Sequence, residues 1–218
     1  MAHGSRPLLK KGQVAHVTIK LISGLPSLRK GEALEVVLAA IKRVNQGGLI
    51  RIVEFSIQSN HVHLIVEAAN SADLSRGMAS LNTGLGMRLN RIWNRTAQKN
   101  LGSVFKERFH MVVVGSPTQM RHLLNYVLRN DVHHGLGLGK LDPCSSAPSF
   151  GGWCELQDAD ARGRTAEAAK ECVSVEPRVW LLKKGWWKVS GSERKLSLGC
   201  LPRLATPKVT STRQVLES

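Results

Sequence analysis

Apolar and polar residues alternate along the first ordered-looking segment of the chain, residues 14–22. Successive side chains of a strand point to opposite faces, so the apolar residues of this segment share one face. His16, Thr18 and Lys20 share the other face. The alternation therefore predicts a half-buried strand with a polar side.

The next segments change from helical to strand periodicity. Apolar residues recur at helical spacing over residues 32–46, and two glycines follow as a stop signal. Two apolar segments come next, 49–58 and 61–68, and only a serine and an asparagine separate them. This pattern predicts a helix followed by a β-hairpin with a tight turn.

The pattern then returns to a helix, a strand and a helix. Leucine and methionine recur every three or four residues after Ser71, which is placed to cap a long helix. Residues 104–114 have strand character, and Ser116 with Pro117 predicts the start of a helix that runs to about Asn130. The order β-α-β-β-α-β-α predicts an α+β, ferredoxin-like (RRM-like) fold, with a mainly antiparallel sheet and helices on one face.

The last third of the chain has weaker periodicity. Residues from Gly135 to about Glu176 are rich in glycine, serine, alanine and aspartate, which predicts a loop or linker. A tryptophan-containing segment, 177–191, follows and is expected to form a short helix. We therefore divide the chain into a domain, 1–140, and a region of linker and basic C-terminal extension, 141–218.

Composition adds a strong positive charge to this picture. Lys and Arg number 31 against 16 Asp and Glu, a formal charge of +15. Such an excess typically attracts a polyanion, either nucleic acid or an anionic membrane surface. No apolar run approaches the roughly 20 residues that span a bilayer, and the N-terminal sequence has no signal-peptide core. We expect a cytoplasmic, nucleic-acid-binding protein without a membrane partner.

The four cysteines indicate neither a metal site nor a disulfide framework. They lie late in the chain and none belongs to a C-x-x-C pair. We expect ordinary reduced thiols.

The segment Asn60-His61-Val62-His63 carries the candidate chemistry. On a strand, residues two apart project from the same face about 6.5 Å from each other, so both imidazoles could bind one metal ion. An ion that acts in catalysis also needs a further ligand and an open position. Tyr126 and Asn130 are four residues apart on the predicted last helix, so one helical face could offer a phenolic nucleophile and an amide ligand.

Each of these signals has an ordinary structural explanation. A His-x-His pair on a strand is more often a pair of surface or satisfied histidines, and a tyrosine on an amphipathic helix usually packs. Asn130 could simply end a helix. The order of the motifs, the spacing of Tyr126 and Asn130 and the basic domain together favour a catalytic site. Tyr126 is also the only tyrosine in the chain.

Four segments resemble, in the same order, the HUH-type single-tyrosine transposases, and most closely the REP-associated tyrosine transposases. They are NHVHLIVE (60–67), the helix 74–95, VFKERFHMVVV (104–114) and LLNYVLRN (123–130). The resemblance covers about residues 14–135 and includes an opening segment similar to that of bacterial relatives. It marks the predicted domain as an HUH endonuclease domain.

The resemblance implies a metal-dependent endonuclease and strand-transferase that acts on single-stranded, usually hairpin-containing, DNA. The expected cofactor is Mg²⁺ or Mn²⁺, and the expected intermediate is a 5′-phosphotyrosine. By position, His61 and His63 match the metal-binding pair, Tyr126 matches the nucleophile, and Asn130 matches the further polar ligand. The oligomeric state stays open between a monomer and a homodimer.

Further basic and aromatic residues are candidates for DNA contacts. Arg88, Arg91 and Arg95 follow one flank of the long predicted helix, and Lys106 and Arg108 follow on the next strand. A solvated helix face explains any single one of them equally well. The tryptophans could stack on bases, although tryptophan beside leucine is more often in a core. They are Trp93, Trp180, Trp186 and Trp187.

Other functions stay open with less support. A domesticated, catalytically inactive relative that only binds DNA hairpins would share the same motifs. Single-tyrosine replication initiators tend to have lysine three residues after the tyrosine, where this chain has Arg129, and no helicase segment follows. An RNA-binding module would need aromatic residues on its central strands. Only Phe55 and Phe109 are candidates for that role.

Overall fold

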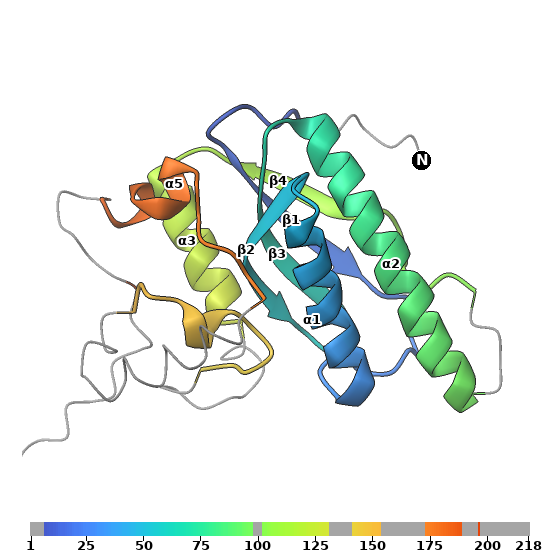
Figure 1. Ribbon diagram of the computed structural model, residues 1–218. Helices are drawn as coiled ribbons and strands as arrows, with labels where there is room; N and C mark the ends of the chain where they lie inside the picture. Colours follow the sequence, from blue (N-terminus) through green and yellow to red (C-terminus); the bar gives the residue numbers. More distant parts are fainter. Residues whose placement is uncertain (1–6, 98–101, 131–140, 154–172, 189–195, 197–218) are drawn as a thin grey trace, which may run out of the picture.

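The computed structural model describes residues 7–97, 102–130, 141–153, 173–188 and 196. A four-stranded sheet forms its centre, with the strand order β2-β3-β1-β4 (Figure 1). Every neighbouring pair is antiparallel. The strands are β1 (Val14–Lys20), β2 (Ile50–Ile57), β3 (His61–Ala68) and β4 (His110–Val114).

Two long helices cover one face of the sheet. They are α1 (Gly31–Gln46) and α2 (Ser71–Ala97), which lie side by side in Figure 1. The apolar residues of β1 and β3 that alternate toward these helices are completely buried, for example Val17, Leu64 and Val66. They form the larger apolar core together with α2 residues such as Met78. We call this side of the sheet the apolar face.

The opposite side of the sheet, which we call the site face, is covered differently. It carries α3 (Pro117–Leu128) and parts of the C-terminal region, including α5 (Trp180–Lys183) (Figure 1). A second apolar core lies there, in which Ile65 packs with Leu124 and Trp186. The predicted α+β fold is confirmed, and α1 and α2 share one face as expected. The last helix lies on the other face because the strands also present apolar residues on that side.

The described part of the region beyond residue 140 packs against this domain. Arg29 and Asp142 form a bidentate ion pair with two contacts of 2.8 Å, and Asp142 is 1% exposed. Glu67 of β3 accepts hydrogen bonds from the backbone N–H groups of Arg178 and Val179. A short 3₁₀ turn, η3 (Gly185–Trp187), follows α5. The predicted short helix is thus present, and the division into two regions stays a prediction.

Three element boundaries differ from the expectation. The predicted strand 104–114 is a strand only from His110, because the preceding residues form just an isolated bridge between Phe105 and Leu21. The long helix is capped by Asn70, whose Oδ1 accepts from Asp73 N at 2.9 Å, while the Ser71 hydroxyl accepts from Leu9 N. The last helix ends at Leu128 instead of continuing to residue 130.

The start of α3 follows the sequence signal closely. Ser116 accepts a hydrogen bond from the backbone N–H of Gln119, and the Gln119 side chain accepts in return from Ser116 N. Pro117 occupies the first turn, where its missing N–H costs no helical hydrogen bond. This capping box fixes where α3 begins and therefore where Tyr126 lies along it.

Two further expectations concern the cysteines and membranes. Cys144 is a buried free thiol, whereas Cys154, Cys172 and Cys200 lie outside the described residues. Within the described ranges, no helix combines the length and apolar character that crossing a bilayer requires.

Candidate active site

The register of the central strands brings polar side chains of β1, β3 and β4 together on the site face. Thr18 lies opposite His63 of β3 and, on its other side, opposite His110 of β4. Lys20 lies opposite His61. Directly opposed residues have Cβ atoms about 4.5–5.5 Å apart. The polar side of the first strand thus becomes one wall of the site.

The two histidines of β3 face each other. Their Nε2 atoms are 3.0 Å apart, and the His61 Nδ1 atom is 2.8 Å from the side-chain oxygen of Asn60. A carboxamide oxygen only accepts hydrogen bonds, so this contact places the proton of neutral His61 on Nδ1. The lone pair of His61 Nε2 then points toward His63.

His63 is held from its other nitrogen. Its Nδ1 atom lies 3.1 Å from His16 Nε2 and 3.2 Å from the Thr18 hydroxyl, and the residue is only 4% exposed. Either partner can accept a proton from Nδ1, which would leave a lone pair on His63 Nε2. Partners of this kind orient metal-binding histidines and fix their tautomer.

Tyr126 reaches the same point from α3. Its hydroxyl oxygen is 3.4 Å from His63 Nε2, and its ring stands edge-on to His63 with centroids 5.2 Å apart. The side chain is 43% exposed, so one side of the phenol is open to a substrate. The sequence prediction that the helix lies beside the histidine strand is confirmed for this residue.

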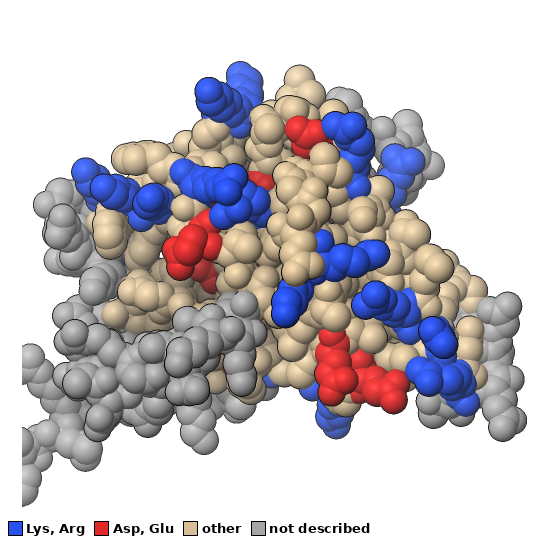
Figure 2. Space-filling view, in the orientation of Figure 1, with Lys and Arg blue, Asp and Glu red and all other residues tan. Residues whose placement is uncertain are grey.

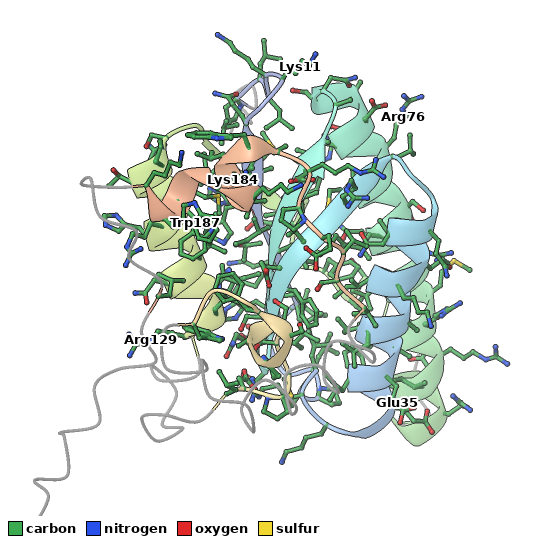
Figure 3. The ribbon with its side chains drawn as sticks, turned by 60° about the vertical axis from the view of Figure 1, so that its left-hand side comes forward. Lys11, Glu35, Arg76, Arg129, Lys184 and Trp187 are labelled. Atoms are coloured by element: carbon green, nitrogen blue, oxygen red, sulfur yellow. The ribbon has the colours of Figure 1, made fainter. Side chains whose placement is uncertain are left out.

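Asn130 lies just beyond the end of α3. Arg129 is the C-cap residue, which Figure 3 labels near the end of this helix, and Asn130 follows it. The Asn130 side chain is 4% exposed, and among the described residues its Nδ2 atom has no hydrogen-bond partner. A buried amide with an unmatched polar atom is costly unless a ligand or water satisfies it.

The donor atoms fit a metal ion. Two nitrogens bound about 2.1 Å from one ion at a right angle lie about 3.0 Å apart, which is the observed separation of the two Nε2 atoms. The unmatched amide of Asn130 adds a polar group of the kind that completes such a site. Over the described ranges, no cluster of three or more His, Cys, Asp or Glu side chains has metal-binding spacing. A metal site here therefore needs the asparagine or solvent in addition to the histidine pair.

His16 sits between the strand and the tyrosine in neutral form. Burial lowers the pKa of His16 to about 4, and the nearby His110 lowers it slightly further. Its ring centroid is 6.0 Å from that of Tyr126. A neutral imidazole in this position can accept a hydrogen bond without adding positive charge next to the histidine pair.

The predicted DNA-binding residues fall in two places. Arg88, Arg91 and Arg95 lie on exposed positions of α2, which covers the apolar face and not the site face. Arg95 contacts Glu32 at 3.4 Å. Lys106 and Arg108 are exposed just before β4, and the backbone N–H of Lys106 donates to the carbonyl of Lys20. This hydrogen bond places Lys106 near the His61 end of the sheet.

The tryptophans divide between core and surface. Trp93 and Trp186 are buried in the two cores, with 6% and 4% exposure, while Trp180 is 55% exposed. Trp187 is half-buried. The core interpretation therefore holds for two of the four.

Sequence reasoning did not assign a role to Thr18, Lys20 or His110, all of which lie in or beside the site. For Thr18 and Lys20 the signal was present, since both share the polar face of the first strand with His16. His110 gave no signal, because its place depends on the pairing of β4 with β1.

Comparison with known proteins identifies the class. The family model described as "Transposase IS200 like" matches residues 26–130, a segment that contains His61, His63, Tyr126 and Asn130. This segment of the chain belongs to the IS200-like transposase family, so the resemblance found in the sequence is confirmed.

A solved structure has the same fold. It is described as the structure of the REP associates tyrosine transposase bound to a REP hairpin. The two chains superpose with a TM-score of 0.54 and share 16% identity, and the alignment covers 82% of this chain and 93% of the other. At this identity the likeness concerns the fold. A search of curated proteins gives no match.

Proposed function

We propose that this protein is a metal-dependent single-stranded DNA endonuclease and strand-transferase that acts through a 5′-phosphotyrosine intermediate. One observation carries the proposal: the Tyr126 hydroxyl and the His61 Nε2 atom both lie within 3.4 Å of His63 Nε2. A nucleophile and a pair of nitrogen ligands thus meet at one point on a partly open surface. The IS200-like family assignment supports the same chemistry.

In this proposal His61, His63 and Asn130 hold a divalent ion, Mg²⁺ or Mn²⁺. When bound, such an ion polarises the scissile phosphate and offsets the charge that develops on it. Asn60 and the β1 residues Thr18 and His16 keep the imidazoles oriented. The apolar residues on the far side of β3, such as Leu64, keep the strand rigid beneath the site.

The proposed reaction moves a phosphoryl group between oxygens. The Tyr126 oxygen attacks the phosphorus of a DNA phosphodiester, a bond from Tyr126 to phosphorus forms, and the bond from phosphorus to the 3′ oxygen breaks. The proton of the phenol ends on the departing 3′ oxygen. The DNA is then linked through its 5′ phosphate to Tyr126, and attack by another 3′-hydroxyl reverses the step and joins a new strand. Because each bond broken is replaced by one of similar energy, no ATP is needed.

The proposed partner is hairpin-containing DNA. The solved relative is described as bound to a REP hairpin, and the present chain carries a formal charge of +15. Figure 2 shows Lys and Arg side chains spread over the visible face with only a few small acidic areas between them. Such a surface attracts nucleic acid. We place the activity in the cytoplasm, and the chain acts as a monomer or a homodimer.

A covalent-adduct experiment tests this proposal. The protein is incubated with a labelled single strand that contains a hairpin, with Mn²⁺ or Mg²⁺, and denatured in SDS. We expect a labelled protein band that is absent with EDTA and absent in Tyr126→Phe. A protein that only binds hairpins would retard the DNA without a covalent band. No band from the wild-type protein, or an undiminished band from Tyr126→Phe, would contradict the mechanism.

A further inference from the structure

A second cavity, of about 370 Å³, lies away from the histidine pair. It is lined by Val53 and Glu54 of β2 and otherwise by residues of 149–152, 174–177 and 182–187. All of these except the two β2 residues lie outside the segment that matches the family model. The C-terminal region therefore builds this pocket, and the family assignment says nothing about it.

Aromatic rings form one side of the pocket. Phe150, Trp186 and Trp187 all line it. The ring centroids of Phe150 and Trp186 are 5.6 Å apart, and those of Trp186 and Trp187 are 5.8 Å apart. Trp186 is buried in the second core, whereas Trp187 is half-buried and keeps part of its surface available. Figure 3 shows Trp187 and Lys184 on the C-terminal segment, beside α3. Such rings suit a flat, aromatic ligand.

Polar groups of both charges complete the pocket. Glu54 is 8% exposed, and burial raises its pKa to about 8, so its carboxyl group is mostly protonated near neutral pH. A protonated carboxyl group can donate one hydrogen bond and accept others. Glu176 and Lys183 are exposed and also line the cavity. The pocket therefore offers acceptors for amino groups and a cation suited to a phosphate.

The pocket and the candidate active site lie on the same face of the sheet. Glu54 pairs with Ile65, and Ser56, two residues further along β2, pairs with His63. Two residues along a strand correspond to about 7 Å. Nucleotides next to a phosphate bound at Tyr126 would therefore lie on the side of the sheet that holds the pocket.

We propose that this pocket binds one unpaired nucleobase that carries an exocyclic amino group, namely cytosine, adenine or guanine rather than thymine. The base stacks on Trp187, and its amino group donates to the carboxyl groups of Glu54 and Glu176. Carboxylates accept from amino groups such as cytosine N4, which thymine lacks. The inference rests on the proposed function, since it takes single-stranded DNA as the ligand.

Metal-free binding of short single strands tests the pocket. Fluorescence anisotropy is measured with labelled pentanucleotides of deoxycytidine, deoxyadenosine and thymidine, in EDTA and at fixed salt, with the full chain. We expect the cytosine and adenine strands to bind at least fivefold more tightly than the thymine strand. Trp187→Ala should weaken their binding about tenfold. Trp180→Ala is the matched control, because Trp180 lies on the same segment, is 55% exposed and does not line the pocket.

Glu176→Gln gives a second test that does not disturb the packing, because this side chain is exposed. It should reduce the preference for cytosine over thymine at least twofold. Equal binding of the three strands by the wild-type protein would overturn the proposal, as would equal losses in Trp187→Ala and Trp180→Ala. Adduct formation without base preference contradicts only the pocket. Base preference without any adduct contradicts only the proposed phosphotyrosine chemistry.

Discussion

The two faces of the sheet are built from the same strands but differ in how they are covered. On the apolar face, two helices from the first half of the chain pack over a continuous apolar surface. On the site face, histidines and buried polar residues alternate with the second core, and distant segments cover them. The comparison indicates that one face provides stability and the other provides chemistry, at the cost of buried polar groups.

The largest effect that we expect comes from a buried acid on the site face. Burial raises the pKa of Glu54 from 4.5 to about 8, so the folded protein binds more protons than the unfolded chain between these values. The stabilising contribution of neutral Glu54 is complete below pH 4.5 and is lost as the pH rises through 8, a change of up to about 5 kcal/mol. Urea unfolding at pH 5, 6.5 and 8 measures it. Glu54→Gln should flatten this loss, and an unchanged slope would contradict the account.

Leu64→Ala tests the apolar face. Leu64 is fully buried against the helices, and truncating such a leucine costs about 2–5 kcal/mol of the free energy of unfolding. Adduct formation per folded molecule should change less than twofold, because the side chain points away from the site. Unfolding by urea gives the first quantity and the covalent-adduct assay gives the second. A large loss of activity in the folded fraction would show that the faces are not separable.

His63→Ala tests the site face in the opposite sense. Removal of one of the two nitrogen ligands should slow adduct formation at least 100-fold, about 2.7 kcal/mol in activation free energy. The midpoint of thermal unfolding should move by only a few degrees, because no apolar packing is lost. Thermal unfolding followed by circular dichroism supplies the control. A variant that keeps more than a tenth of the wild-type rate would argue against this ligand.

Thr18→Val should give the smallest effect. The Thr18 hydroxyl is 3.2 Å from His63 Nδ1 and is replaced by a methyl group of similar size. Loss of such an outer partner typically weakens metal binding about 10-fold, and His16 stays as a second partner. Isothermal titration with Mn²⁺ measures this directly. Thr18→Ser, which keeps the hydroxyl, should bind Mn²⁺ as the wild type does, and equal losses in both variants would point to packing instead.

The contrast between the faces also explains what the sequence revealed. Alternation in β1 and β3 placed Leu64 toward the core and His61 with His63 on the other side, because strand periodicity is a local property. The same local signals located Ser116 as the cap of α3. These features depend only on near neighbours in the chain.

The features that escaped prediction depend on contacts between distant residues. Glu67 accepts from Arg178 N across 111 positions, and Asp142 pairs with Arg29 across 113, so no local pattern indicates either contact. The placement of α3 on the site face likewise follows from which surfaces remain uncovered. The pocket above Glu54 forms only when the C-terminal region has packed there.

The identity of the covalently modified residue tests the central claim most directly. Wild-type protein is incubated with hairpin DNA and Mn²⁺, digested with nuclease and protease, and analysed by mass spectrometry. The account predicts that the peptide containing Tyr126, the only tyrosine of the chain, carries a 5′-linked nucleotide. A nucleotide attached to a serine, threonine or histidine, or no modified peptide under conditions in which the DNA is cleaved, would contradict it.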